Sequence, residues 1–301
     1  MLRRRALLAA PALLIPRRAS AQASGAELLL FCVADLHSAS ATAPQLVAAV
    51  DAALAAHPDA EAMILVNGDV FERGNAIARR SDGAGDWALL DALRDRAPVV
   101  LNIGNHETAL VDDLAEVVRR ARERDLVVVS SIRDARTGRP VADTRMRWPL
   151  RRQRQLGLVG IATDDAATYR EAARAELILP EPVAWARAVL PWALDGADVR
   201  VVLSHAGLAA DRAILPLLPD GTLMIGGHEH LRLTHAAGAT RYVHTGSWGR
   251  FLTVAAWVGG VGWRLAEVPL TRDGPGDAAL AARLRDVAEA HLAPEDREVV
   301  A

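Results

Sequence analysis

The chain has 301 residues, of which 51% are hydrophobic and 24% charged, a composition that can form a sizeable buried core. All 35 of its basic residues are arginines, which excludes chemistry that depends on a Walker lysine or a Schiff-base lysine. After the N-terminal stretch there is no run of about 18 apolar residues, so we expect no membrane-spanning helix.

The first 23 residues have the features of an export signal peptide. Three arginines at residues 3–5 precede an apolar stretch over residues 6–15, and small residues at 21–23 form a cleavage pattern. The arginine pair also fits twin-arginine export. We therefore expect a periplasmic or secreted protein; the alternative is a loose basic tail on a cytoplasmic protein.

Removal of residues 1–23 takes away five arginines and no acids. It leaves 30 arginines against 37 acidic residues, a formal charge of −7. Proteins that coat nucleic acid need a basic face, so this charge disfavours that class of partner.

Apolar runs alternate with helical patterns over the next hundred residues. Short apolar runs at 28–33, 62–66, 99–103 and 127–129 predict buried strands, and the periodicity of residues 44–56, 86–96 and 110–124 predicts amphipathic helices. This alternation predicts a largely parallel sheet with helices on its faces.

The second half is less regular. Residues 133–154 are rich in arginine and contain glycine and proline, which indicates hairpins or loops. Further strands are predicted at 156–161, 199–203, 222–225 and 241–244, two antiparallel strands at 252–258 and 262–268, and helices at 183–194 and 278–291. No repeat or long linker interrupts the pattern, so we expect residues 24–301 to form one domain.

Polar side chains follow five of the predicted strands directly. They are Asp35 and His37, Asp69, Asn105 with His106, His205, and His228 with His230. Because the carboxyl ends of parallel strands share one edge of a sheet, these clusters can meet in space.

Asp and His side chains offer the oxygen and imidazole ligands that manganese, iron, zinc or cobalt ions accept. Two such ions, roughly 3.5–4 Å apart, would clamp the oxygens of a phosphoryl transfer and lower the pKa of a bound water. Singly, each residue more often caps a helix or shapes a turn; together they favour a metal site. We assign no role to His57, His235 and His291, and we expect Cys32, the single cysteine, to be a buried core thiol.

The motifs Asp-x-His, Gly-Asp, Gly-Asn-His-Glu, a later His and Gly-His-x-His, in that order over residues 35–230, resemble the calcineurin-like metallophosphoesterases. The resemblance implies an α/β fold, a four-layer αββα sandwich of two mixed β-sheets flanked by helices. It also implies that a metal-bound hydroxide attacks a phosphate mono- or diester while His106 acts as general acid. Two divalent metal ions would be held, the first by Asp35, His37 and His230, the second by Asn105, His205 and His228, with Asp69 bridging both.

Two further segments point to different branches of that superfamily. Residues 68–74, Gly-Asp-Val-Phe-Glu-Arg-Gly, are similar to the Gly-Asp-x-Val-Asp-Arg-Gly motif of protein serine/threonine phosphatases. That similarity implies that Arg73 holds a phosphate oxygen and that Glu72 orients His106. The alternative is an ordinary Glu–Arg pair on a solvated loop.

Residues 242–250 resemble the loop after the last ligands in periplasmic 5′-nucleotidase catalytic domains. Ala109 stands where those enzymes have an Asp, and only about 50 residues follow Arg250, so their nucleotide specificity is not carried over. Trp248 in this loop is expected to pack in the core; the alternative is that it stacks on a substrate ring.

The resemblance leaves three functions open. The first is an exported phosphoesterase with a small phosphate-ester substrate. The second is a metal-dependent hydrolase of sulfur-linked groups, and the third is an exported protein that binds metal or phosphate without turnover. All expected ligands and His106 are present, which favours catalysis. No sequence feature indicates the oligomeric state.

Overall fold

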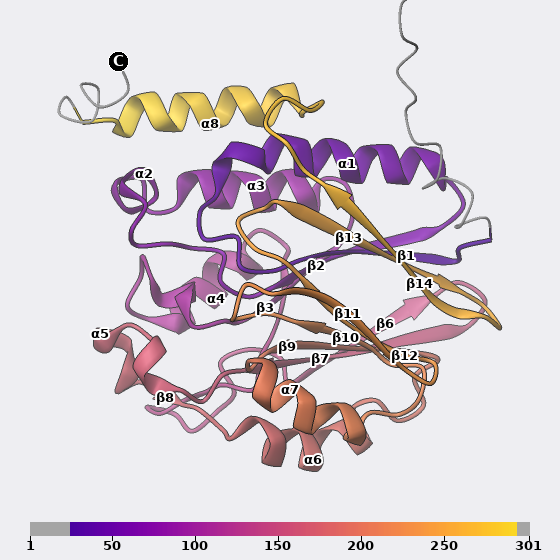
Figure 1. Cartoon of the computed structure of the whole chain (residues 1–301). Helices are drawn as coiled ribbons and strands as arrows, with labels where there is room; N and C mark the ends of the chain where they lie inside the picture. The colour runs from indigo at the N-terminus through magenta and orange to yellow at the C-terminus, as the bar shows by residue number, and fades with distance from the viewer. Residues whose placement is uncertain (1–24, 294–301) are drawn as a thin grey trace, which may run out of the picture.

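Two six-stranded mixed sheets lie face to face between layers of helices (Figure 1). The computed structural model describes residues 25–293. The predicted signal peptide, residues 1–23, lies outside the described residues.

The first sheet has the strand order β14-β13-β1-β2-β3-β4. The strands from β1 to β4 are parallel, and β13 runs antiparallel to β1 and β14. Their bounds are β1 Leu28–Val33, β2 Glu61–Asn67, β3 Val99–Asn102, β4 Val127–Val129, β13 Phe251–Val258 and β14 Gly262–Pro269.

The second sheet has the order β11-β12-β10-β9-β7-β6, with parallel inner strands and an antiparallel strand at each edge. Its strands are β6 Arg145–Leu150, β7 Arg154–Ala162, β9 Val199–His205, β10 Leu223–Gly226, β11 Arg232–Ala237 and β12 Thr240–Thr245. A separate pair joins β5 (Arg133–Asp134) to β8 (Leu177–Ile178).

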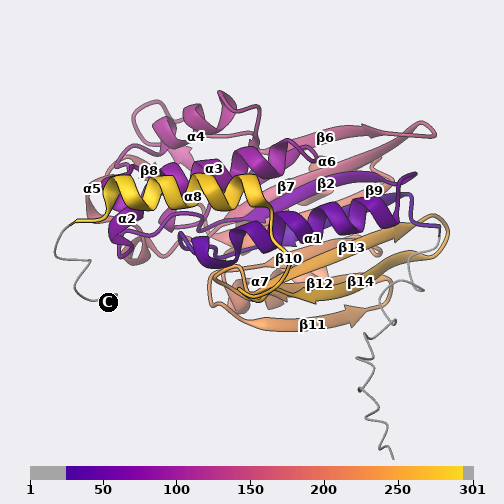
Figure 2. The same ribbon diagram turned by 90° about the horizontal axis from the view of Figure 1, so that it is seen from above.

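Helices cover the outer face of each sheet (Figure 1). On the first sheet lie α1 (Ala43–Ala56), α3 (Ala84–Arg94) and α4 (Leu114–Arg122), and on the second lie α6 (Pro182–Ala193) and α7 (Leu208–Ile214). Helix α8 (Ala278–His291) packs outside α1 and α3, which Figure 2 shows from above. The shorter elements are α2 Ala76–Arg80, α5 Glu171–Arg174 and 3-10 turns at Ser40–Thr42, His106–Thr108, Ala166–Thr168 and Leu215–Leu217.

Strand β1 shows why the sequence contains uninterrupted apolar runs. Leu29 and Phe31 belong to the core beneath the helices, whereas Leu28, Leu30 and Cys32 belong to the core between the two sheets. Successive side chains of a strand point to opposite faces, so a strand covered on both faces must be apolar throughout. The predicted four-layer sandwich and the buried Cys32 thiol are thus confirmed.

The structure confirms a hairpin within residues 133–154, where β6 pairs antiparallel with β7 across a short turn. Strand β6 forms an edge of the second sheet despite Pro149. An edge strand tolerates proline because one side of its backbone needs no partner strand. Within residues 25–293, no helix is long and apolar enough to cross a membrane.

Candidate metal centre

The polar residues that follow the strands meet at one edge of the sandwich. Asp35 follows β1, Asp69 follows β2 and Asn105 follows β3, and these three strands are parallel neighbours. In the facing sheet, His205 ends β9 and His228 follows β10. Both sheets therefore contribute ligands from the carboxyl ends of their strands.

Three groups of side chains have donor atoms close enough to hold a metal ion, each group within 4.8 Å. They are Asp35, His37 and His230; Asp69, His205 and His228; and His37, Asp69 and His106. The first two match the two metal positions expected from the sequence.

Asp69 stands between those two positions. Its Oδ2 lies 3.1 Å from His205 Nε2 and 3.8 Å from His37 Nε2. Asn105 joins the second group, because its Oδ1 lies 2.9 Å from His228 Nδ1. All seven predicted ligands are brought together, and Asp69 has the location that a bridging ligand requires.

The backbone at these residues is strained. Asp35, His37, Asp69, His228 and His230 all have φ between 47° and 83°, in the left-handed region. Residues other than glycine rarely adopt this conformation, which costs on the order of 1–3 kcal/mol each. The surrounding fold thus stabilises a strained arrangement that aims the side chains inward.

Two glycines allow the ligand loops to approach one another. A Cβ on Gly68 would lie 2.4 Å from His205 Nδ1, and a Cβ on Gly104 would lie 2.3 Å from Asp69 Oδ1. Gly68 also has a φ of +79°, but Gly104 has an ordinary φ. At Gly104 the requirement is therefore close approach and not a left-handed backbone conformation.

Burial and charge set the protonation of the cluster. Burial lowers the pKa of His37 to about 4 and raises that of Asp35. For His205, burial opposes the charged form, but the neighbouring Asp69 carboxylate outweighs it and raises the pKa to about 10. The pKa of Asp69 is lowered in turn, since His205 overcomes the effect of burial.

These donors fit divalent cations. Among the described residues 25–293, His205 Nε2 is fully buried without a hydrogen-bond partner, although it faces Asp69 Oδ2 and, at 3.8 Å, Asp35 Oδ1. Burial of a ring nitrogen between two carboxylates costs folding free energy unless a proton or a bound cation lies between the nitrogen and the carboxylates. A bound divalent ion would take the place of that proton.

Glu72 lies between a ligand and the predicted general acid. Its Oε2 is 3.3 Å from His37 Nδ1 and 3.3 Å from His106 Nδ1. A carboxylate on the outer nitrogen of a metal-binding histidine fixes the ring orientation. Glu72 can therefore orient both imidazoles. Arg73 is exposed and lines a cavity beside His106.

Two buried features of the site were missed by sequence reasoning. Glu107 is 1% exposed and accepts hydrogen bonds from the backbone N–H groups of Asp69, Val70 and Gly104 at 3.1, 2.9 and 2.6 Å. Burial raises its pKa to about 7. Its place within Gly-Asn-His-Glu was the only available signal.

The second missed feature is an asparagine clasp, formed by Asn67 and Asn102. Asn67 Nδ2 donates across the sandwich to the carbonyls of Ser204 and Ile225, at 2.8 and 3.0 Å. Asn102 Nδ2 donates to Asn67 Oδ1 at 2.9 Å and to the Ile161 carbonyl at 3.0 Å. The clasp joins the two sheets directly behind the ligands.

Trp248 does not pack in the core, which corrects the expectation from the sequence. It is 40% exposed, and its ring lies edge-on to that of His230, with centroids 4.6 Å apart. The Arg250 guanidinium covers the Trp248 ring at 4.8 Å. Trp248 is therefore a rim residue of the metal centre, whereas His57, His235 and His291 lie outside the three ligand groups.

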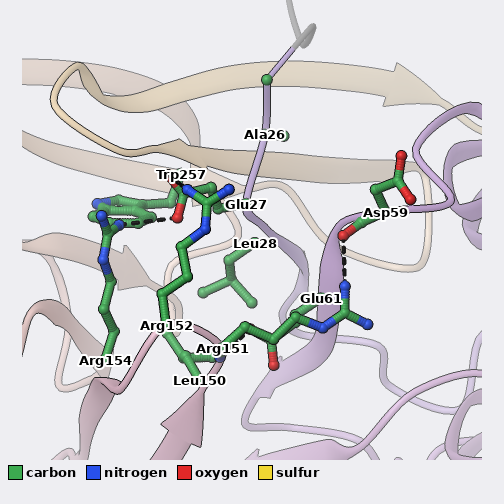
Figure 3. Close-up of a pocket in the computed structure, with 11 residues that line it drawn as sticks. Ala26, Glu27, Leu28, Asp59, Glu61, Leu150, Arg151, Arg152, Arg154 and Trp257 are labelled. Atoms are coloured by element: carbon green, nitrogen blue, oxygen red, sulfur yellow. Dashed lines mark hydrogen bonds and ion pairs between the residues drawn. The ribbon is translucent and has the colours of Figure 1, made fainter.

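A second cavity, of about 400 Å³, lies at the opposite ends of the strands (Figure 3). Leu28 and Glu61, the first residues of β1 and β2, line it. Its arginines are matched by acids: Arg152 and Arg154 both pair with Glu27, at 3.2 and 3.0 Å. We assign no function to this balanced cavity.

Solved structures share this fold. They include a 5′-nucleotidase precursor from Thermus thermophilus (20% identity, TM-score 0.67, covering 87% of this chain and 58% of that one) and sulfate thiohydrolase SoxB from the same organism (15%, 0.71, 88% and 61%). A third is NAD nucleotidase from Haemophilus influenzae (12%, 0.67, 88% and 60%). The chain spans about three-fifths of the length of these proteins, and at such identities the likeness establishes the fold alone. No curated protein matches the chain.

A protein-family model adds evidence from the sequence itself. The model, described as calcineurin-like phosphoesterase, matches residues 28–232, more than half of the chain. That range contains β1 to β10 and every candidate ligand. The chain therefore belongs to the calcineurin-like phosphoesterase family.

Proposed function

We propose that the protein is an exported, dinuclear metal-dependent hydrolase of phosphate esters. The observation that carries the proposal is the convergence of seven donor residues into two adjacent groups around Asp69, with His106 beside them. Asp35, His37 and His230 would hold one ion, Asn105, His205 and His228 the other, and Asp69 both. When bound, two such ions supply Lewis acidity and an activated water.

The protein's own groups would perform the remaining steps. His106 is partly exposed and faces the cluster, so it can give a proton to the leaving oxygen. Glu72 Oε2 lies 3.3 Å from His106 Nδ1, so it would accept the proton of that nitrogen and keep the other ring nitrogen available for the transfer. Arg73 would grip a phosphate oxygen through its planar guanidinium.

The direct test is hydrolysis of p-nitrophenyl phosphate and bis-p-nitrophenyl phosphate by metal-stripped protein and by protein reloaded with manganese. We expect turnover only after reloading, no turnover in Asp69→Ala, and a loss of about 10²–10⁴-fold in His106→Ala. The preferred substrate decides between monoesterase and diesterase. Arg73→Ala should weaken binding or turnover.

His235→Ala is the matched control, because His235 is exposed on β11 and remote from the ligands. Two metal ions bound per chain without turnover of either ester would refute the phosphoesterase proposal. That result would favour hydrolysis of a sulfur-linked group or binding without catalysis. A screen of thiosulfonate and sulfate-thiol substrates would separate these two.

Export is supported by the order of arginines, apolar stretch and small residues within residues 1–23. Replacement of the arginine pair by lysines should block export if the twin-arginine route operates. Secretion that survives this change would exclude that route.

A further inference from the structure

A cavity of about 170 Å³ adjoins the metal centre on the His106 side. Asn105 and His106 form its wall toward the metal ligands, and Arg73, Ala109, Tyr169 and Arg170 lie around the rest. It is smaller than the pockets that enclose drug-sized ligands. It can therefore hold a small substituent of a substrate.

The charged residues that line this cavity have one sign. Among the residues that line it, the charged ones are Arg73 and Arg170, and none is acidic. Within residues 25–293, no ion pair is made by the Arg73 guanidinium. Arg170 pairs with Asp112, which lies outside the lining. Unlike the balanced cavity at the other end of the strands, this one favours an anion.

The loop that carries Arg170 is held in place. Tyr169 is 1% exposed, and its hydroxyl donates to the Thr163 carbonyl at 2.9 Å. Arg174 Nε donates to the Tyr169 carbonyl at 2.9 Å, and Asn105 Nδ2 donates to the Thr168 carbonyl at 3.3 Å. A guanidinium on a fixed loop loses little freedom when it binds a ligand.

We propose that this cavity receives a second anionic group carried by the leaving group, and that Arg170 is the residue that selects for it. This inference rests on the proposed function, since the leaving group reaches the cavity only if His106 is its proton donor. The substrate class is then a phosphate ester whose alcohol carries a carboxylate or a further phosphate. Ala109 contributes a small neutral wall that leaves room for this group.

The test compares aryl phosphates that differ mainly in the substituent at the para position. 4-Carboxyphenyl phosphate and 1,4-phenylene bisphosphate carry a second anion, and 4-carbamoylphenyl phosphate is the neutral match of the carboxylate. We expect the metal-loaded wild type to have a kcat/KM at least tenfold higher for an anionic substrate than for the amide. The larger of the two anionic values identifies whether a carboxylate or a phosphate fits.

Two variants should move that ratio in opposite directions. Arg170→Gln should reduce it about tenfold, whereas Asp112→Asn should increase it by freeing Arg170 from its partner. General loosening of the fold would not produce opposite effects. Arg187→Gln, on the exposed face of α6, removes the same charge elsewhere and should leave the ratio unchanged.

A wild-type ratio near one, or a ratio that Arg170→Gln does not change, would overturn the inference while the phosphoesterase function stands. If the metal-loaded wild type hydrolyses none of the three esters, the proposed function and this inference are both overturned.

Discussion

Substitution of Gly104 by alanine should displace Asp69, the proposed bridging ligand. The added Cβ would lie 2.3 Å from Asp69 Oδ1 and 2.8 Å from the Asp69 backbone nitrogen. Ordinary contact begins at 3.4 Å, so the carboxylate must retreat by about 1 Å. A displacement of that size in a catalytic group costs roughly 10²-fold in rate. We expect Gly104→Ala to lose about two orders of magnitude in kcat/KM and to bind fewer than two metal ions.

The assays are metal content by elemental analysis and hydrolysis of a nitrophenyl phosphate by reloaded protein. Gly85→Ala is the matched control: Gly85 lies inside α3, and the added methyl would meet only the end of the Leu284 side chain, at 3.3 Å. Alanine in a helix is favoured over glycine by about 1 kcal/mol, so that variant should retain activity and stability. Full metal content and activity within threefold of wild type in Gly104→Ala would show that the close approach is not required.

Three further perturbations test the buried groups and the metals. Glu107→Gln places an amide nitrogen against backbone N–H donors, so it should destabilise the fold by about 2–4 kcal/mol in urea denaturation. Glu171→Gln, at an exposed position, is the neutral control. Equal denaturation midpoints for the wild type and Glu107→Gln would contradict the role assigned to Glu107. Burial raises the pKa of Asp86 to about 7, so the folded protein holds a proton that the unfolded chain releases near pH 4, and stability falls as pH rises between these values. Asp86→Asn should remove that loss of stability, which is on the order of 4 kcal/mol at most. In urea denaturation the variant should be no more stable than the wild type near pH 3.5 and should show its full gain in stability at pH 8. A stability difference that does not depend on pH would count against this explanation. Chelation of the metals should lower the melting temperature measured by calorimetry by at least 5 °C, because ions that bind only the folded state stabilise it. Reloading with metal should restore the melting temperature. An unchanged melting temperature would argue against metal binding.

The main strands and the placement of the ligands could be predicted from the sequence. Strands β1 and β4 have the predicted bounds, because runs buried on two faces are apolar from end to end. At β1, β2, β3, β9 and β10, a polar cluster at or just after the strand end contains the candidate ligands. At these positions one local pattern therefore predicted both the strand and the candidate ligand.

Other features depend on tertiary context. Strand β11 is exposed along most of its length and has no alternating pattern of burial, so these residues form a strand because they pair with β12. The bonds of Asn67 to Ser204 and Ile225 join residues more than 130 positions apart, a relation that no local pattern records. Trp248 was expected in the core from its residue type, but its position beside His230 leaves it exposed.

The asparagine clasp holds the ligand-bearing strand ends in place but does not include the loop of Arg170. Asn67 and Asn102 tie the sheets together at the strand ends that carry the ligands. The loop of Arg170 lies outside that tie and contacts the centre through the hydrogen bond from Asn105 Nδ2 to the Thr168 carbonyl. Changes in this loop can alter which leaving group fits while the spacing of the ligands stays the same. In such a scaffold, substitutions in the loop can change the substrate preference while the arrangement of the ligands is kept.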